Sequence, residues 1–137
     1  MKSMNMVAFA ALVAVMALFM VQPVLAHHSS AGFSQEVKEI SGTVKEFQFR
    51  NPHSWIQVNV PEANGKITEW SIEWGSPNQL GRDGIRPSTF APGMNVILKI
   101  RPMMNGTPVG GFVGAKMSDG RTLGKWDTGG GSKPISE

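Results

Sequence analysis

Three histidines in this chain could bind a metal ion: His27, His28 and His53. The first two are adjacent. The adjacent pair follows Val24-Leu25-Ala26, which has the small-residue form of a signal-peptide cleavage site. Cleavage after Ala26 would make His27 the first residue, so that its free α-amine and its ring could chelate one metal ion without help from the fold. A ring nitrogen from His28 or His53 would then complete a planar set of three nitrogens.

Copper(II) is the metal that this donor set favours, because nitrogen-rich planar sites suit copper and copper stands at the top of the divalent affinity order. The arrangement is similar to the histidine brace of periplasmic copper carriers and copper monooxygenases. The amine and the imidazoles must lose protons before they bind, so copper affinity should fall in acid. Two plainer interpretations stay open: His27 and His28 belong to a polar, frayed terminus, and His53 is a turn histidine that bonds nearby carbonyl groups.

Residues 1–26 have the three parts of a secretory signal. Lys2 supplies the positive start, and an apolar run extends from Val7 to Val21 before the small-residue end. A membrane span needs about 20 apolar residues, and nothing later in the chain is long or apolar enough. We therefore expect a cleaved signal helix and a periplasmic or secreted protein with no membrane span in its mature chain. The alternative is an uncleaved N-terminal anchor.

The composition narrows the class of protein. The chain has 137 residues and a formal charge of +3, and loss of the signal removes only one of its positive charges, Lys2. So small a charge argues against a nucleic-acid partner. The absence of cysteine excludes disulfides, thiolate ligands and a lipid-bearing cysteine. No nucleophile triad, phosphate loop, zinc pair or dinucleotide fingerprint is present, so we assign no catalytic residue and an enzyme is the weaker class.

Tryptophans provide the candidate ligand-binding surface. Trp55 lies opposite the apolar face of its expected strand and, with Asn51 in the preceding turn, could stack a sugar, a base or another partner. Trp70 and Trp74 share the parity of the apolar residues in their strand, which favours positions in the core.

Two other pairs are weaker candidates. Glu69 and Glu73 would lie about 13 Å apart along an extended strand, which is too far for either glycosidase geometry, so we reject them as paired catalytic carboxylates. Met103 and Met104 could be soft copper(I) ligands, although filling gaps in a small core is the default role of methionine.

Alternation of apolar and polar residues predicts five strands. The expected spans are 37–49, 55–60, 66–74, 94–103 and 109–117. In the first strand the apolar parity changes between Val44 and Phe47, which indicates a β-bulge and a sheet that curls. Asn64-Gly65 has the composition of a tight hairpin turn, in which both central residues take positive φ. Asn105-Gly106 predicts another hairpin turn.

A short helix is expected after the third strand, with Ser76 as N-cap and Pro77 at its first position. Three strands, a short helix and two strands form the element order of the oligonucleotide/oligosaccharide-binding (OB) fold. We therefore expect an all-β, OB-like five-stranded small barrel over residues 27–123 and a disordered tail over 124–137. An antiparallel sandwich is the alternative.

Several short motifs extend over nearly all of the expected mature domain. They are His27-His28-Ser29, Gly42-Thr43-Val44, Asn51-Pro52-His53-Ser54-Trp55, Gly75-Ser76-Pro77-Asn78 with Leu80, and Pro92-Gly93. In these motifs the chain resembles a family of small exported bacterial proteins catalogued as a domain of unknown function. The resemblance implies no reaction and no ligand residue.

We expect an exported binding module that binds copper through His27. Its partner would be the metal ion or a periplasmic protein. Two other functions stay open: a non-metal binding or assembly module for a protein, glycan or small molecule, and a copper monooxygenase.

Overall fold

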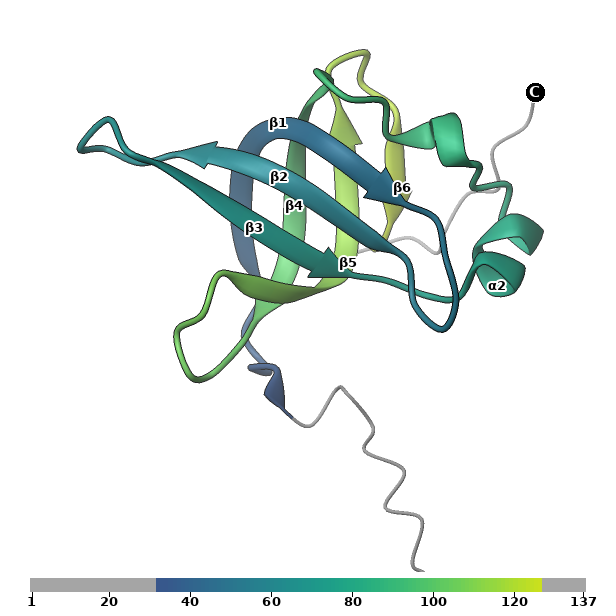
Figure 1. The fold of residues 1–137 in the computed structure, drawn as a ribbon, viewed down its shortest axis with the longest axis horizontal. Helices are drawn as coiled ribbons and strands as arrows, with labels where there is room; N and C mark the ends of the chain where they lie inside the picture. The colour runs from purple at the N-terminus through teal and green to yellow at the C-terminus, as the bar shows by residue number, and fades with distance from the viewer. Residues whose placement is uncertain (1–31, 127–137) are drawn as a thin grey trace, which may run out of the picture.

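The computed structural model describes residues 32–126, which form a small β-barrel (Figure 1). The strands are β1 (Lys38–Gln48), β2 (Trp55–Pro61), β3 (Ile67–Glu73), β4 (Asn95–Pro102), β5 (Val109–Met117) and β6 (Thr122–Gly124). Between β3 and β4 lie the helix α2 (Pro77–Arg82) and the 3-10 helix η2 (Pro87–Thr89). In this part of the chain no helix is long and apolar enough to cross a membrane. The expected signal, residues 1–26, lies outside the described residues.

The strand order closes the sheet into a barrel. The order is β3-β2-β1-β4-β5-β6, and β3 also pairs in parallel with β5. The remaining neighbours are antiparallel. The OB-like five-stranded barrel with a short helix between its third and fourth strands is therefore confirmed, and the sandwich alternative is wrong. The sixth strand, β6, adds to the outer edge of β5.

The bulge predicted in β1 is present. The register with β2 shifts between Val44 and Glu46, so Val44 is buried before the bulge and Phe47 packs against the core after it. Strand β1 pairs with β4 through its first half and with β2 through its second half. Thr43 pairs with both neighbours, and at the adjacent Gly42 a Cβ atom would come within 2.4 Å of the Asn59 carbonyl oxygen. The change in apolar parity thus lies just after the point at which β1 stops pairing with β4 and continues in its pairing with β2.

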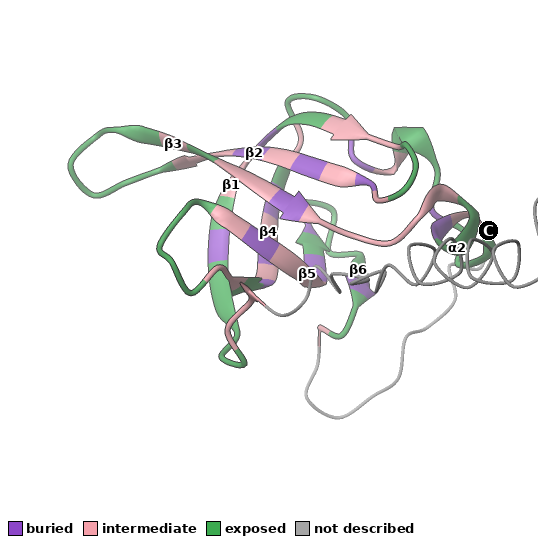
Figure 2. Ribbon diagram, turned by 60° about the horizontal axis from the view of Figure 1, so that its bottom comes forward, coloured by how far each residue is buried: buried purple, intermediate pink, exposed green. Residues whose placement is uncertain are grey.

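Buried residues lie on every long strand (Figure 2), and their side chains form the core of the barrel. The most buried are Val44, Ile56, Val58, Ile72, Leu98 and Ile100, together with Leu80 of α2 and Phe90 after η2. The Phe90 ring lies 5.4 Å from the Phe47 ring and 6.1 Å from the Trp74 ring, measured between centroids. Phe90 therefore closes one end of the core.

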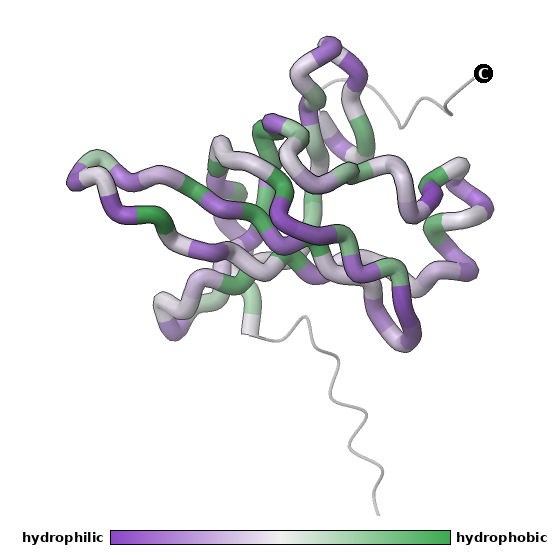
Figure 3. Tube along the Cα trace, turned by 45° about the horizontal axis from the view of Figure 1, so that its top comes forward, coloured by the Kyte–Doolittle hydropathy of each residue, from purple (hydrophilic) through white to green (hydrophobic). Residues whose placement is uncertain are grey.

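The outer end of the β2–β3 hairpin carries hydrophilic residues (Figure 3), and its turn differs from the expected one. Gly65 has φ +82°, but no non-glycine residue between 32 and 126 has positive φ, so Asn64 does not share that conformation. Instead, the Asn64 side-chain oxygen accepts a hydrogen bond from the Lys66 N–H at 2.8 Å. The prediction of two positive φ angles was wrong because a three-residue turn needs only one.

The domain extends past its expected end at residue 123. Gly124 belongs to β6, and the Lys125 N–H donates to the Val113 carbonyl at 2.8 Å. The Lys99 ammonium donates to the Trp126 carbonyl at 2.5 Å and lies over the Trp126 ring. These backbone and side-chain contacts hold residues 124–126 of the expected tail against the barrel. Residues 127–137 lie outside the described residues.

Candidate binding pocket

The loop between β1 and β2 is joined to the link between β3 and α2. The Ser54 N–H donates to the Gly75 carbonyl at 3.0 Å, and the Trp74 N–H donates to the Ser54 carbonyl at 2.9 Å. Ser54 is fully buried, and its hydroxyl has no hydrogen-bond partner within the described chain. These bonds bring Asn51-Pro52-His53-Ser54-Trp55 beside Gly75-Ser76-Pro77-Asn78, two motifs that are distant in the sequence.

His53 and Glu73 form the polar contact at this junction. The histidine Nδ1 lies within hydrogen-bonding distance of a Glu73 carboxylate oxygen. The Glu73 side chain is only 11% exposed, whereas the His53 side chain is 42% exposed. In a neutral histidine, donation from Nδ1 leaves Nε2 with a lone pair. The contact therefore orients the ring so that Nε2 can bind a metal ion or accept a proton.

A pocket of about 600 Å³ surrounds this contact. Its walls are Phe33, Gln35, Pro52, His53, Glu73, Trp74, Gly75, Ser76, Gln79, Arg101, Gly111 and Phe112. Trp74 and Phe112 are stacked, with centroids 3.9 Å apart and planes 27° apart. The walls thus come from segments that are distant in the sequence. They are the residues before β1, the β1–β2 loop, the end of β3 with its link to α2, α2 itself, and β4 and β5.

Helix α2 begins directly at the pocket. The Ser76 hydroxyl caps the helix by accepting from the Gln79 N–H at 3.4 Å, and Pro77 occupies the first turn, as predicted. A Cβ atom on Gly75 would lie 2.9 Å from the Gln79 side-chain oxygen, so the glycine lets Gln79 fold back over the link. The local cap therefore places one neutral polar side chain in the wall.

The model of a family of unknown function, DUF6152, matches residues 14–112. The chain belongs to this family. No curated protein and no solved structure matches the chain. Every wall residue of the pocket lies within the part that matches DUF6152, from Phe33 to Phe112, whereas β6 lies beyond it.

Of the site residues predicted for this DUF6152 chain, only His53 is among the described residues that line the pocket. His27 and His28 lie outside the described residues. His53 lines the pocket, and its side chain contacts the Glu73 carboxylate within the described residues, not a nearby carbonyl group. Asn51 is exposed, and Trp55 is half-buried on the outer face of β2, outside the pocket walls.

Sequence reasoning missed Glu73 as the partner of His53. Glu73 is the cross-strand neighbour of Trp55, two residues after His53. Residues directly opposite in an antiparallel pair share a face. The signal was therefore the hairpin register, which sets the end of β3 beside the residues that precede β2.

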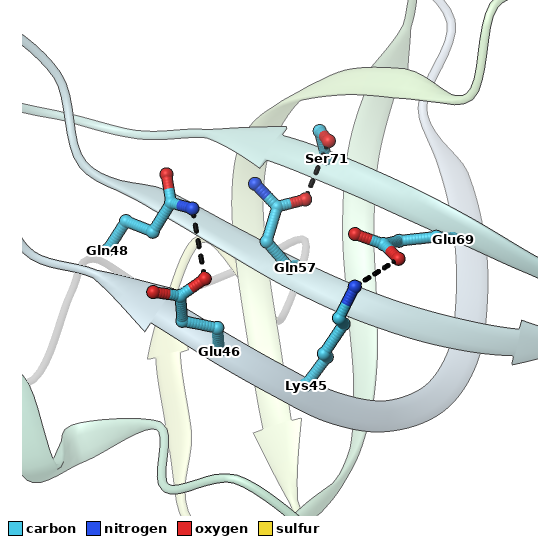
Figure 4. A network of polar contacts seen from close by, with 6 residues as sticks. All are labelled: Lys45, Glu46, Gln48, Gln57, Glu69 and Ser71. Atoms are coloured by element: carbon cyan, nitrogen blue, oxygen red, sulfur yellow. Dashed lines mark hydrogen bonds and ion pairs between the residues drawn. The ribbon is translucent and has the colours of Figure 1, made fainter.

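The outer face of β1, β2 and β3 carries polar residues that bind one another (Figure 4). Lys45 pairs with Glu69 at 2.6 Å, the Ser71 hydroxyl donates to Gln57 at 2.6 Å, and Gln48 donates to Glu46 at 3.0 Å. Glu69 and Glu73 have different partners, which agrees with rejecting them as a catalytic pair. With these groups already paired, the pocket is the stronger candidate site.

Metal-ligand types are sparse in the described domain. Between residues 32 and 126 no three histidine, cysteine, aspartate or glutamate side chains are grouped for one metal ion. Met104 is 69% exposed. Met103 packs against Gly32, where a Cβ atom added to the glycine would lie 3.2 Å from the Met103 sulfur. His53 with Glu73 is accordingly the part of the described domain with the geometry of a metal-binding histidine.

Proposed function

We propose that this DUF6152 protein is an exported, periplasmic or secreted binding module for copper(II). The α-amine and ring of His27, freed by cleavage after Ala26, would hold the ion together with Nε2 of His53. The observation that carries the proposal is the His53–Glu73 contact at the pocket. Histidines that bind metals almost always donate their other ring N–H to a partner such as a carboxylate, which orients the ring and raises its basicity.

The chain is long enough to bring His27 to His53. Phe33 and Gln35 line the same pocket as His53, and His27 precedes Phe33 by six residues. Six residues reach at most about 20 Å. In the proposed site this link would carry the amine of His27 to the pocket. His28 competes for the third position, and the Glu73 contact favours His53.

The proposed site depends on the free amine. Copper in this site would be held by three nitrogens that must be unprotonated, so binding is expected to weaken as the pH falls. The module would hold the ion, and the aromatic walls of the pocket would limit its contact with water.

A copper(II) titration followed by electron paramagnetic resonance tests the proposal. The mature chain beginning at His27 should give a tight one-to-one, nitrogen-rich signal. A chain with one extra residue before His27 keeps every side chain but loses the amine chelate, so its affinity should fall sharply. A chain with one extra residue after Glu137 is the matched control and should bind like the mature chain. Equal affinity in the N-terminally extended chain would refute the proposal.

A second candidate function is a non-metal binding or assembly module. It is favoured by the stacked Trp74 and Phe112 in the pocket wall, which could hold part of a small molecule, a glycan or a periplasmic protein. A His27→Ala, His28→Ala double variant separates the two functions. If the double variant keeps a bound partner, the second function is supported. If the double variant loses copper binding and no partner is found, the first function is supported.

A further inference from the structure

Arg101 brings an unpaired positive charge to the pocket. In β4 the neighbouring Ile100 is fully buried, so the alternation of the strand turns Arg101 outward. Its cross-strand neighbour on β5 is Gly111, which has no side chain to cover it. Within residues 32–126 the guanidinium has no hydrogen bond or ion pair. Its planar set of donors matches a carboxylate in a bidentate geometry.

The pocket also carries one acidic group, and that group contacts His53. Glu73 is the single carboxylate among the described wall residues, and it is engaged by His53. The other polar walls come from the neutral side chains of Gln35, Ser76 and Gln79. An anion that enters the pocket therefore meets the Arg101 cation, neutral hydrogen-bonding groups and one carboxylate, which already contacts His53.

Aromatic side chains supply a flat apolar surface beside the cation. Trp74 and Phe112 are stacked in the wall, and Phe33 faces Gly111, where a Cβ atom would come within 3.3 Å of the Phe33 ring. Glycine at this position lets the Phe33 ring approach the strand. The volume of about 600 Å³ is within the range of about 300–1,000 Å³ common for small-molecule sites.

We propose that the pocket binds a small organic acid whose carboxylate is attached to a flat apolar ring. Arg101 would receive the carboxylate, and the ring would lie against the surface made by Phe33, Trp74 and Phe112. This inference rests on the second candidate function and gives it a ligand class. It does not require copper.

Nuclear magnetic resonance of the metal-free mature chain, kept in a chelator, tests this inference with benzoate as the probe. Benzoate should shift the Arg101 side-chain N–H and the Trp74 indole N–H in a saturable way. Benzamide has the same shape without the charge, and acetate has the charge without the ring. Each should bind about tenfold more weakly or worse, because each lacks one of the two interactions.

Two variants assign the interaction to its residues. Arg101→Gln should weaken benzoate binding by about tenfold or more, because it removes a charge-assisted bidentate contact. Lys66→Gln removes the same charge at the remote end of the β2–β3 hairpin and should leave binding unchanged. Phe33→Leu should weaken benzoate and benzamide together while the chain stays folded.

Absence of saturable shifts with benzoate would overturn the inference, and so would equal affinities for benzoate and benzamide. An equal loss in Arg101→Gln and Lys66→Gln would also overturn it, because it would reveal attraction to net charge alone. The chelator removes copper from every sample, so these outcomes are independent of the copper titration. Failure of copper binding with successful benzoate binding would leave the second function in place.

Discussion

Glu69 and Glu73 show how a single partner changes what a side chain can do. They share the outer face of β3, four residues apart in the chain. Glu69 pairs with Lys45, where both side chains are about half exposed to water. Glu73 is nearly buried and holds Nδ1 of His53. An exposed ion pair contributes little to stability, whereas a carboxylate behind a histidine sets which ring nitrogen faces a ligand.

Glu73→Gln is expected to weaken copper(II) binding by the mature chain by about 10–100-fold, the usual effect of removing such a carboxylate partner. Glutamine keeps the size of the side chain and loses its charge. Glu69→Gln is the matched control on the same strand and face, and its affinity should not change. Competitive copper titration measures both affinities, and thermal unfolding checks that both variants are folded. Equal affinities in the two variants would contradict the role of Glu73.

The β2–β3 hairpin determines which residue stands behind His53. Its register pairs Trp55 with Glu73 and Pro61 with Ile67. A two-residue turn at Asn64-Gly65 would shift this pairing by one residue and set Glu73 opposite the buried Ile56. The observed turn, with Gly65 alone at positive φ, keeps Glu73 on the outer face. Turn length and strand parity therefore decide the site together.

Gly65→Ala is expected to lower the free energy of unfolding by about 1–2 kcal/mol, the cost of a left-handed conformation for a residue with a Cβ atom. No atom lies within 4 Å of the Cβ position, so the cost is one of backbone conformation and not of a clash. Gly65→Asn should lose less, because asparagine tolerates this conformation better. Urea denaturation measures both variants. Equal stability of Gly65→Ala and the unsubstituted chain would contradict the role of this turn.

Trp74 belongs both to the core and to the pocket wall. Phe90 is fully buried and contacts Phe47 and Trp74, and Trp74 in turn stacks on Phe112 in the pocket wall. The end of the barrel that Phe90 closes is thus also the support of the pocket. Packing at this end of the molecule should set the shape of the pocket as well as the stability of the fold.

Phe90→Ala is expected to reduce the free energy of unfolding by about 3–5 kcal/mol, because it empties a large volume in a close-packed core. It should also change the near-ultraviolet circular dichroism of Trp74, whose ring loses its neighbour. Phe33→Ala, at the half-buried rim of the pocket, is the control and should cost less. Urea denaturation with both spectroscopic signals checks the prediction. Similar costs for the two variants would place the support of the fold elsewhere.

Local patterns in the sequence determined the elements of this protein. Apolar alternation predicted all five barrel strands, and the change of parity after Val44 predicted the bulge in β1. Ser76 and Pro77 predicted the start of α2. These signals are readable because side-chain direction, helix capping and turn conformation depend on residues a few positions apart. The resemblance to a family of unknown function is also confirmed, because the chain belongs to that family.

Only the tertiary structure decided how these elements build a site. Closure of β3 onto β5, the pairing of His53 with Glu73, and the meeting of Phe33, Trp74 and Arg101 around one pocket join residues that are distant in sequence. The sequence placed Glu73 and Arg101 only within two expected strands, 66–74 and 94–103, and indicated no partner for either. Their neighbours depend on register and barrel closure, which result from long-range pairing and from burial of the whole core.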